Sequence, residues 1–543
     1  MQKNISPLTR LWNLVREEKT DITAIYFFAI IGSLIQLSVP LGIQAILGFV
    51  LGGTLSASLV VLISVLVIGV LLTGIMQVNQ MKIIEKIQQK LFVKYAFAFA
   101  NRIPLLDLKK VDAFYLPELV NRFFDVTALQ KNMAKLLLDL PIATVQILFG
   151  LLVLSFYHPF FILFGLLLLL LLLLILYATG SSGLQSSLEE SSNKYSLVGW
   201  FEEMARLVKS FKFAAVANLH MAKANERAVA YLQARTNHFL VLLLQYRTLV
   251  FFKVVITAAM LIAGVVLLLN QQINIGQFVA AEIIILVVIN SVEKIIVNLE
   301  AVYDVLTAVE KVNKVIDKPI EPTGKLQFEN HQPLHLQVKE LQFGYEPGKL
   351  VLSNVSFEVQ PGEKVSVIGN EGAGKSTLLN LLLGVYCDFG GLILINDTPI
   401  GNYDMSSLRE RTGIFFPQEN VFYGSLWENL TMGRAGVSKD HVYYLVQQTG
   451  LHSFLSTLPN GYDTLLDPTG KRLPRNVIQK ILLVRALAHR PQLVIMEEPW
   501  QGIEEPYRSR IQQLLLGLAE TTVVVATNDE SFTRLCNQKL TLT

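Results

Sequence analysis

The chain has 543 residues, of which 52% are hydrophobic and 16% are charged, against roughly 25% charged residues in soluble domains. This balance excludes an ordinary soluble protein and indicates a membrane part joined to a soluble part. The formal net charge of +3 is too small to indicate a nucleic-acid partner. The two cysteines, Cys387 and Cys536, lack metal-ligand spacing and fit a reduced, cytosolic compartment.

Residues 1–316 predict a membrane domain with six spanning helices. Two stretches, Ile22–Met81 and Leu140–Leu188, contain no Asp, Glu, Lys or Arg. One crossing needs about 20 apolar residues, so each stretch holds two helices, and the first is too long for a signal peptide. A third apolar pair follows between residues 241 and 298. The expected spans are about 22–50, 56–81, 136–157, 159–180, 241–269 and 275–298.

Lys and Arg residues set the expected orientation of these spans. The three short turns between paired helices, at 52–58, 157–159 and 270–274, contain neither residue. The long connections 82–139 and 189–240 carry ten and seven of them, and their apolar residues keep a helical period. We therefore expect a multi-pass protein of the cell (inner) membrane. Both termini, the second domain and the helical long connections are expected in the cytoplasm.

Ionisable residues inside the last two apolar spans have two interpretations. Glu282 lies at membrane depth, where a carboxylate is costly. It marks a transport pathway, or it is a protonated or snorkelling side chain near the outer interface. Lys253 and Glu293 lie at similar depth near the cytoplasmic side and fit a structural ion pair as well as a substrate contact.

The second half predicts an α/β domain. A proline-containing polar linker covers 317–336, and short apolar strands then alternate with helices over 337–543. An apolar alternation at 365–368 is followed by a glycine-rich stretch and a helix-like run at 378–383. That stretch is a phosphate-loop pattern made of Gly369, Asn370, Gly372, Ala373, Gly374, Lys375, Ser376 and Thr377.

In this context the loop is expected to bind a nucleoside triphosphate, the alternative being a glycine-rich structural turn. Its glycines let backbone N–H groups surround phosphate oxygens at a helix N-terminus. Lys375 is expected to reach the β- and γ-phosphates, and Ser376 to hold Mg²⁺. ATP and Mg²⁺ are the expected cofactors.

With these motifs the chain resembles an ABC transporter, and more narrowly an exporter half-transporter. The resemblance implies an all-α six-helix transmembrane domain followed by an α/β P-loop NTPase (ABC-type) domain. Tyr345, in Phe343-Gly344-Tyr345, matches the residue that stacks on adenine. Gln418, in Phe416-Pro417-Gln418, matches the glutamine that contacts Mg²⁺ and the attacking water. In Leu493-Val494-Ile495-Met496-Glu497-Glu498, the two acids match the Mg²⁺-ordering residue and the general base.

Other segments extend the resemblance over nearly the whole chain. Val421–Leu430 is similar to the exporter stretch that faces the intracellular helices. Glu118–Arg122 and Val208–Phe211 resemble the flanks of the coupling helices, and Gly276–Phe278 resembles the opening of the sixth helix.

Several positions depart from the family pattern. Where the signature L-S-G-G-Q is expected, this chain has Leu473-Pro474-Arg475-Asn476-Val477, called the signature slot below. Proline and non-glycine residues restrict the close backbone approach that a phosphate needs. This indicates a dead signature, although Arg475 still offers positive charge.

The acidic pair, the histidine position and the phosphate loop also depart from the family pattern. Glu497 stands where the family has Asp, which alters its reach toward Mg²⁺. Thr527-Asn528 stands where the family has the histidine that contacts the γ-phosphate. Pro468 replaces an acid that touches the coupling helices, and Glu371 replaces a small polar loop residue. A carboxylate at Glu371 must point away from phosphate or weaken its binding.

The expected function is ATP-dependent export by a half-transporter acting as a homodimer or heterodimer, with ATP binding favoured over fast hydrolysis. Lys375, Gln418 and Glu498 are the expected catalytic residues, and Ser376, Gln418 and Glu497 the expected metal residues. The alternative is an ATP-binding, nearly inactive subunit that gates or scaffolds a secretion assembly. An importer is disfavoured, because importers typically have separate membrane and nucleotide chains.

The resemblance is nearest to bacterial exporters associated with protein secretion. It implies the lipid bilayer and a periplasmic adaptor as possible partners, and it names no cargo. A self-cleaving peptide exporter is not expected, because no peptidase-like segment precedes Ile22.

Overall fold

The computed structural model describes residues 6–53, 57–112, 115–214, 218–328, 333–466 and 473–543. The chain divides into two compact units with their own hydrophobic cores. The first unit contains Met1–Pro104 and Phe114–Lys318, and the second contains Leu105–Ala113 and Pro319–Thr543.

The segment Leu105–Ala113 differs from the sequence-based division, which assigns it to the membrane domain. Backbone hydrogen bonds explain why it groups with the second unit. The Asp107 N–H donates to the Pro319 carbonyl at 3.0 Å, and the Glu321 N–H donates to the Leu105 carbonyl at 2.9 Å. A helix from the first half of the sequence is thereby built into the second unit.

The first unit is all-α. Its helices are α1 (Pro7–Glu17), α2 (Lys19–Leu51), α3 (Ala57–Arg102), α5 (Leu116–Val120), η2 (Asn121–Phe124), α6 (Asp125–Tyr157), α7 (Phe160–Arg206), α8 (Val208–Phe213), α9 (Leu219–Leu269), α10 (Ile275–Val297) and α11 (Leu299–Ile316). The short η1 (Ile103–Leu105) lies where the chain passes between units. Among the described residues, six helical segments are long and apolar enough to cross a membrane, which confirms the predicted six-helix fold.

The long helices continue beyond the length that a bilayer requires. Helix α9 has 51 residues, roughly 75 Å at 1.5 Å per residue, against a hydrocarbon core of about 30 Å. Past its apolar half, α3 still buries Ile84, Ile87, Leu91 and Tyr95, spaced at three and four residues. The helical period predicted for the long connections therefore reflects real packing against the other helices.

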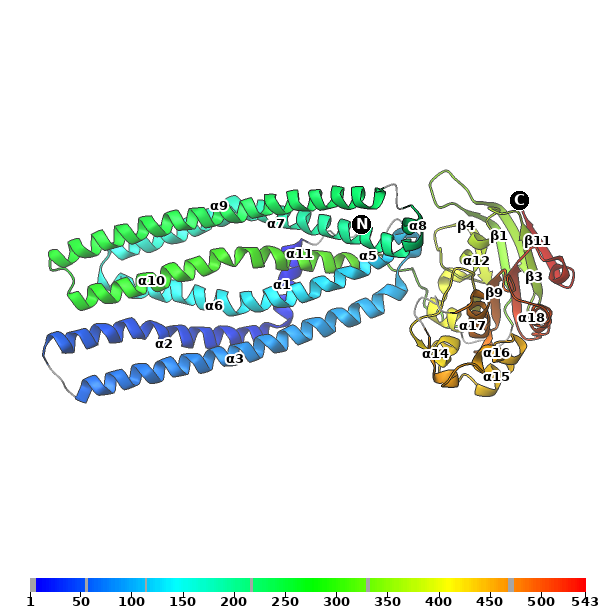
Figure 1. Cartoon of the computed structure of the whole chain (residues 1–543), viewed down its shortest axis with the longest axis horizontal. Helices are drawn as coiled ribbons and strands as arrows, with labels where there is room; N and C mark the ends of the chain where they lie inside the picture. The colour runs from blue at the N-terminus through cyan, green and yellow to red at the C-terminus, as the bar shows by residue number, and fades with distance from the viewer. Residues whose placement is uncertain (1–5, 54–56, 113–114, 215–217, 329–332, 467–472) are drawn as a thin grey trace. The chain divides into compact units, whose positions relative to one another are not determined.

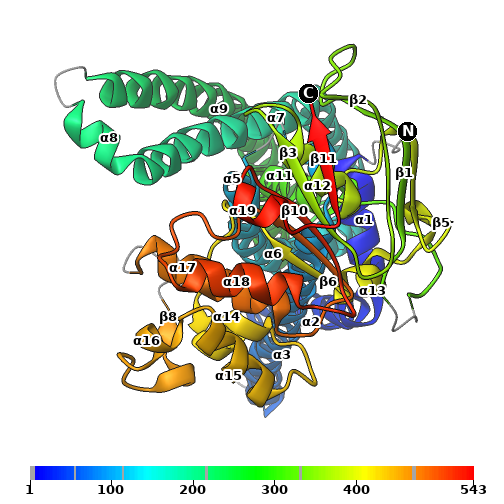
Figure 2. The same ribbon diagram turned by 90° about the vertical axis from the view of Figure 1, so that its right-hand side faces the viewer.

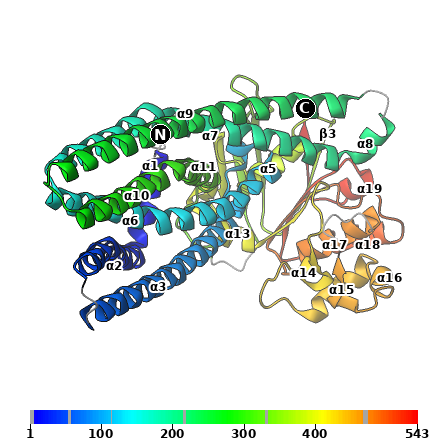
Figure 3. The same cartoon turned by 60° about the vertical axis from the view of Figure 1, so that its left-hand side comes forward.

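The helices of this unit pack in pairs. Helix α2 lies beside α3, α6 beside α10, and α7 beside α9, with α8 joining the ends of the last pair (Figures 1 and 3). One core cluster includes Leu154, Leu168 and Ile284, all fully buried. The predicted turn at 270–274 gains a capping box, since Asn274 and Gln277 cap each other's backbone N–H at 2.8 Å.

The ionisable residues in the last two apolar spans have different surroundings in the structure. Lys253 Nζ and Glu293 Oε2 lie 2.8 Å apart, so these residues form an ion pair. Glu282 is half-buried, and its side chain hydrogen-bonds to no residue in the described part of the chain. Its role stays a prediction.

The second unit is mixed α and β. Its strands are β1 (Leu336–Phe343), β2 (Leu352–Val359), β3 (Lys364–Gly369), β4 (Gly390–Ile395), β5 (Thr398–Pro399), β6 (Thr412–Phe415), β7 (Gly424–Ser425), β8 (Leu465–Leu466), β9 (Leu493–Glu497), β10 (Thr522–Ala526) and β11 (Gln538–Leu542). Its helices are α4 (Leu108–Val111), α12 (Lys375–Leu382), η4 (Ile400–Asn402), α13 (Met405–Glu410), α14 (Leu426–Thr431), α15 (Lys439–Gln448), α16 (His452–Leu455), η5 (Gly461–Asp463), α17 (Arg475–Leu487), α18 (Tyr507–Leu516) and α19 (Glu530–Thr533).

A five-stranded parallel sheet organises this unit, in the order β11-β3-β10-β9-β6. Its central strand β10, Thr-Val-Val-Val-Ala, is buried at every position, as expected for a strand covered on both faces. An antiparallel sheet in the order β2-β1-β4-β5 and the short pair β7-β8 complete the strands. Figure 2 shows α14, α15 and α16 gathered in a helical part apart from β3, β10 and β11.

Candidate nucleotide-binding site

The carboxyl ends of four parallel strands meet at one edge of the sheet. Ala526 at the end of β10 pairs with Val367 of β3 on one side and Glu497 of β9 on the other. Phe415 at the end of β6 pairs with Met496 of β9. Ligands of open α/β sheets bind at this edge. All the candidate phosphate and metal residues end these strands or follow their ends.

The phosphate loop leaves β3 and enters α12. Gly372 and Gly374 have φ values of +83° and +87°, a region that L side chains rarely adopt. A Cβ on Gly374 would also lie 2.7 Å from Leu352 Cδ2. These two positions therefore require glycine, and the curled backbone leads directly to the N-terminus of α12, where N–H groups favour an anion.

Lys375 and Ser376, at the start of α12, reach the loop and β9. Lys375 Nζ donates to the carbonyls of Gly369 at 2.7 Å and Asn370 at 2.9 Å, so it lies across the loop. Ser376 Oγ donates to Glu497 Oε1 at 2.5 Å. The prediction that Ser376 and Glu497 share one site is thus supported by direct contact.

The second oxygen of Glu497 tests whether a cation fits here. Glu497 Oε2 is buried and has no hydrogen-bond partner among the described residues. A buried carboxylate oxygen without a partner is costly. An Mg²⁺ ion takes carboxylate and hydroxyl oxygens as ligands, so the Ser376–Glu497 pair fits this ion.

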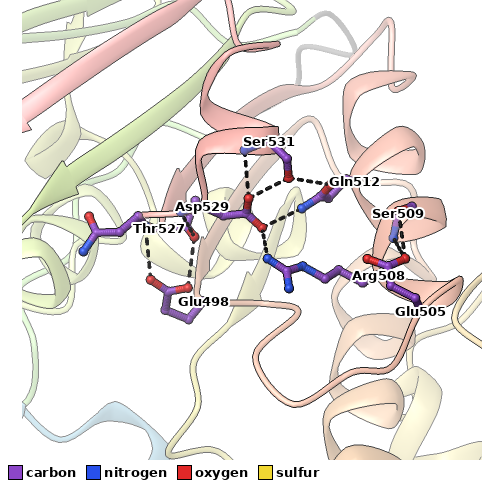
Figure 4. Close-up of polar contacts among 9 residues, drawn as sticks. Glu498, Glu505, Arg508, Ser509, Gln512, Thr527, Asp529 and Ser531 are labelled. Atoms are coloured by element: carbon purple, nitrogen blue, oxygen red, sulfur yellow. Dashed lines mark hydrogen bonds and ion pairs between the residues drawn. The ribbon is translucent and has the colours of Figure 1, made fainter.

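Glu498 has a strained backbone and a fixed carboxylate. Its φ is +43°, which is unusual for a residue with a side chain and is typical of functional sites. The Thr527 hydroxyl donates to Glu498 Oε2 at 2.9 Å, and the Asn528 N–H donates to Oε1 at 3.3 Å. Figure 4 shows the carboxylate of Glu498 facing Thr527. The residues that replace the family's histidine therefore hold the predicted general base.

Asn528 also binds the first residue of the phosphate loop. Its side-chain oxygen accepts from the Gly369 N–H at 3.2 Å, and its Nδ2 donates to the Gly369 carbonyl at 3.1 Å. The sequence comparison marks Thr527 and Asn528 only as departures. Their contact with both the loop and Glu498 follows from the folded sheet, in which β10 lies between β3 and β9.

Asp529 anchors this segment to α18. Its carboxylate accepts from Arg508 Nη2 at 2.5 Å, from Gln512 Nε2 at 2.8 Å and from the Ser531 hydroxyl at 2.6 Å (Figure 4). Burial opposes ionisation, but the hydrogen bonds from Ser531 and Arg508 outweigh it and lower the pKa of Asp529 to about 2. The Asp529 N–H then donates to the Thr527 hydroxyl at 3.2 Å. This network orients the hydroxyl that binds Glu498.

Tyr345 lies beside the helix that follows the loop. Its hydroxyl is 3.0 Å from Thr377 Oγ1, and its ring packs edge-on against Phe343 and Tyr386. The side chain is 44% exposed, which leaves ring surface for stacking.

The side chains of Gln418 and Glu371 lie outside the hydrogen-bond network of the site. Gln418 is exposed three residues after β6, and its side chain hydrogen-bonds to no described residue. Glu371 is also exposed and has no ion pair within the described chain. Neither side chain contacts Lys375, Ser376 or Glu498 through a hydrogen bond.

The exporter-type stretch after Gln418 is built around a buried amide. Asn429 is fully buried, and its side chain bonds to the Phe422 backbone N–H at 3.0 Å and carbonyl at 2.9 Å. Arg485 of α17 donates to the Asn429 carbonyl at 2.8 Å. Tyr423 is 66% exposed beside these contacts.

The signature slot forms the start of α17. Pro474 is the N-cap residue and provides no side-chain cap. Its carbonyl accepts from the Val477 N–H at 3.0 Å, and Arg475 is exposed in the first turn. A proline N-cap supplies neither hydroxyl nor N–H to a ligand. Pro468, the other departure named from the sequence, lies outside the described residues.

Comparison with known proteins agrees with this geometry. The family profile described as ABC transporter matches residues 352–501, from β2 to the segment after Glu498. Residues 352–501 thus match the ABC transporter domain, which is a little over a quarter of the chain. The structure of a bacterial Atm1-family ABC exporter with ATP bound superposes with a TM-score of 0.83 at 18% identity, over 97% of this chain and 94% of that one. This likeness shows that the chain has the predicted fold.

Two curated relatives match a smaller region. An ATP-dependent lipid A-core flippase of Saccharophagus degradans is 30% identical over 223 residues, which are 41% of this chain and 38% of that protein. The cyclolysin secretion/processing ATP-binding protein CyaB of Bordetella pertussis is 32% identical over 194 residues, 35% of this chain and 27% of that protein. These matches thus span well under half of each relative.

Proposed function

We propose that the chain is a half-transporter of an ATP-dependent exporter, acting as a dimer in the cell (inner) membrane. The observation that supports this most is the Ser376–Glu497 contact beside a phosphate loop, with Glu498 fixed at the next position. Six helices able to cross a membrane precede that site in the same chain. Its second unit is cytoplasmic, because Lys and Arg residues gather on the long connections 82–139 and 189–240 and are absent from the three short turns.

Each site residue has a role in this proposal. Tyr345 stacks on the base, and the loop N–H groups with Lys375 bind the phosphates. Ser376 and Glu497 hold Mg²⁺, with Gln418 joining them, and Mg²⁺ supplies charge neutralisation on the phosphates. Glu498 orients the attacking water and accepts its proton.

Turnover is slow in this proposal, because two parts of the site differ from the family pattern. The signature slot begins with a proline N-cap, and Asn528 bonds to Gly369 in place of a histidine. In a homodimer each site pairs a phosphate loop with a Pro474-containing slot. In a heterodimer one site combines Glu498 with a complete signature and lacks only the histidine.

Steady-state hydrolysis in lipid nanodiscs tests the proposal. The chain, alone and with any half-transporter or periplasmic adaptor that co-purifies from native membrane, is compared with its Glu498→Gln variant. The proposal expects slow phosphate release that falls at least about tenfold in the variant, because the base is lost. Equal rates in both proteins would reject ATP-driven export.

A second candidate function follows from the signature slot itself. A chain whose α17 starts with Pro474-Arg475 is suited to bind ATP without hydrolysing it, and so to gate or scaffold a secretion assembly. The same assay separates the two functions. This candidate expects ATP binding, no Glu498-dependent release, and a second half-transporter in the purified complex.

A further inference from the structure

The second unit has a cavity of about 810 Å³ at the edge of the parallel sheet opposite to the nucleotide site. Residues that directly precede three strands line it: Arg411 before β6, Gln492 before β9 and Thr521 before β10. Helices α15 and α18 add His441 and Arg510. The nucleotide residues follow the other ends of these strands, so this cavity is a separate place on the protein.

The cavity is lined by arginines that have no acidic partner. Among the described residues, no carboxylate lies within ion-pair distance of Arg411, Arg490 or Arg510, and Arg510 stacks on a tyrosine ring. Nearby arginines outside the cavity behave differently. Arg409 pairs with a glutamate at 2.6 Å, and Arg508 pairs with Asp529 at 2.5 Å. Glu520 is the one acid that lines this cavity.

Nearby arginines contribute to lowered pKa values of two histidines that line the cavity. Burial and the neighbouring Arg434 and Arg411 lower the pKa of His489 to about 4. Burial lowers the pKa of His441 as well, and Arg490 lowers it further. No carboxylate raises either pKa, so the arginines add to the lowering that burial causes.

A buried polar atom at the wall of the cavity also lacks a partner. Gln492 is 6% exposed, and its Oε1 has no hydrogen-bond partner in the described part of the chain. Both ring nitrogens of His489 are buried as well. Tyr444, stacked beside His441, leaves 47% of its side chain exposed at the rim. The lining thus combines guanidinium groups, an unsatisfied polar atom and an aromatic face.

We propose that this cavity binds a compact polyanion, a small organic molecule with two or more phosphate or carboxylate groups. Arginine is the side chain best suited to both groups, because its planar fork donates two parallel hydrogen bonds. The volume lies within the range of small-molecule sites, about 300–1,000 Å³. This inference does not depend on ATP hydrolysis by the chain.

Calorimetric titration of the full chain in nanodiscs tests the site, with inorganic pyrophosphate and citrate as the probes. The Lys375→Ala background removes the competing phosphate loop. In that background we expect saturable binding of at least one probe. The variant Arg411→Gln/Arg510→Gln should weaken it at least about tenfold, because two charge-assisted contacts are lost. Arg534→Gln, which removes an exposed arginine outside the cavity, should leave it unchanged.

The two probes identify the chemical class. Binding of pyrophosphate alone assigns phosphates, and binding of citrate alone assigns carboxylates; either supports the site if the arginine dependence holds. Thermal unfolding of each variant confirms that it is folded. Binding of neither probe, or equal affinity in Arg411→Gln/Arg510→Gln and its background, would overturn the proposal.

Discussion

The Thr527 hydroxyl donates to Glu498 Oε2 at 2.9 Å, and this bond joins the end of β10 to the proposed general base that follows β9. Thr527 is fully buried and itself accepts from the Asp529 N–H. The Glu498 carboxylate is therefore oriented by its own chain before any ligand binds. Orientation of a base contributes to the rate of the chemical step and little to ligand affinity.

The variant Thr527→Val tests that orientation. It keeps the shape of the side chain and removes the hydroxyl, so we expect kcat for ATP to fall about tenfold, equivalent to about 1.4 kcal/mol, with ATP affinity unchanged. Thr527→Ser retains the hydroxyl and should retain the rate. Phosphate release and ATP titration measure the two quantities, and an unchanged kcat in Thr527→Val would contradict the role.

Asn528, in contrast to Thr527, is expected to affect ATP affinity. Its side chain makes two hydrogen bonds to Gly369 and so stabilises the start of the phosphate loop. We expect Asn528→Ala to weaken ATP binding about three- to tenfold, since each bond contributes about 1 kcal/mol or less. The backbone N–H to Glu498 remains in this variant. Equal ATP affinity in Asn528→Ala and the unaltered chain would exclude this contribution.

The signature slot is testable by repair. The triple variant Pro474→Ser/Arg475→Gly/Asn476→Gly gives α17 a serine N-cap and glycines that allow close backbone approach. We expect ATP turnover to rise at least about tenfold, which is 1.4 kcal/mol of transition-state stabilisation. Adding Glu498→Gln to the repaired slot should abolish the gain. A repaired slot without a gain would show that the slot is not what limits turnover.

The lowered pKa of His489 predicts that the stability of the folded chain depends on pH. Its pKa is lowered from 6.5 to about 4 in the folded chain, so the unfolded chain binds the proton more tightly. The neutral imidazole therefore contributes stability that is full above pH 6.5 and is lost as pH falls toward 4. Between pH 7 and pH 5 we expect a loss of about 2 kcal/mol. His489→Gln should remove this part of the pH dependence in thermal unfolding, and an equal pH slope in both proteins would contradict it.

Contiguous motifs made much of this molecule predictable from sequence. The apolar runs predict six spanning helices, and strand, loop, lysine and helix occur in one stretch around Lys375. Contacts between residues on different strands were harder to predict from the sequence. Thr527 and Asn528 reach Glu498 and Gly369 only because β10 lies between β3 and β9. The spacing of residues along the sequence does not predict that strand order.

Two further features depend on tertiary contacts rather than on local pattern. Leu105 and Asp107, which lie between α3 and α4 in sequence, hydrogen-bond to the segment that follows Lys318 and belongs to the second unit. The cavity lined by Arg411, Arg490 and Arg510 draws on residues about 100 positions apart in the chain. Their missing acidic partners become visible only when the fold brings them to one edge.

The central claim, that the loop holds ATP and Glu498 hydrolyses it slowly, is tested most directly by one radiolabelled-ATP experiment. Full chain in nanodiscs is mixed with limiting ATP, and bound nucleotide and released phosphate are counted from the same samples over time. We predict prompt binding that Lys375→Ala abolishes, followed by slow phosphate release that Glu498→Gln abolishes. Absence of bound ATP in these samples, or release that is equal in Glu498→Gln, would contradict the account.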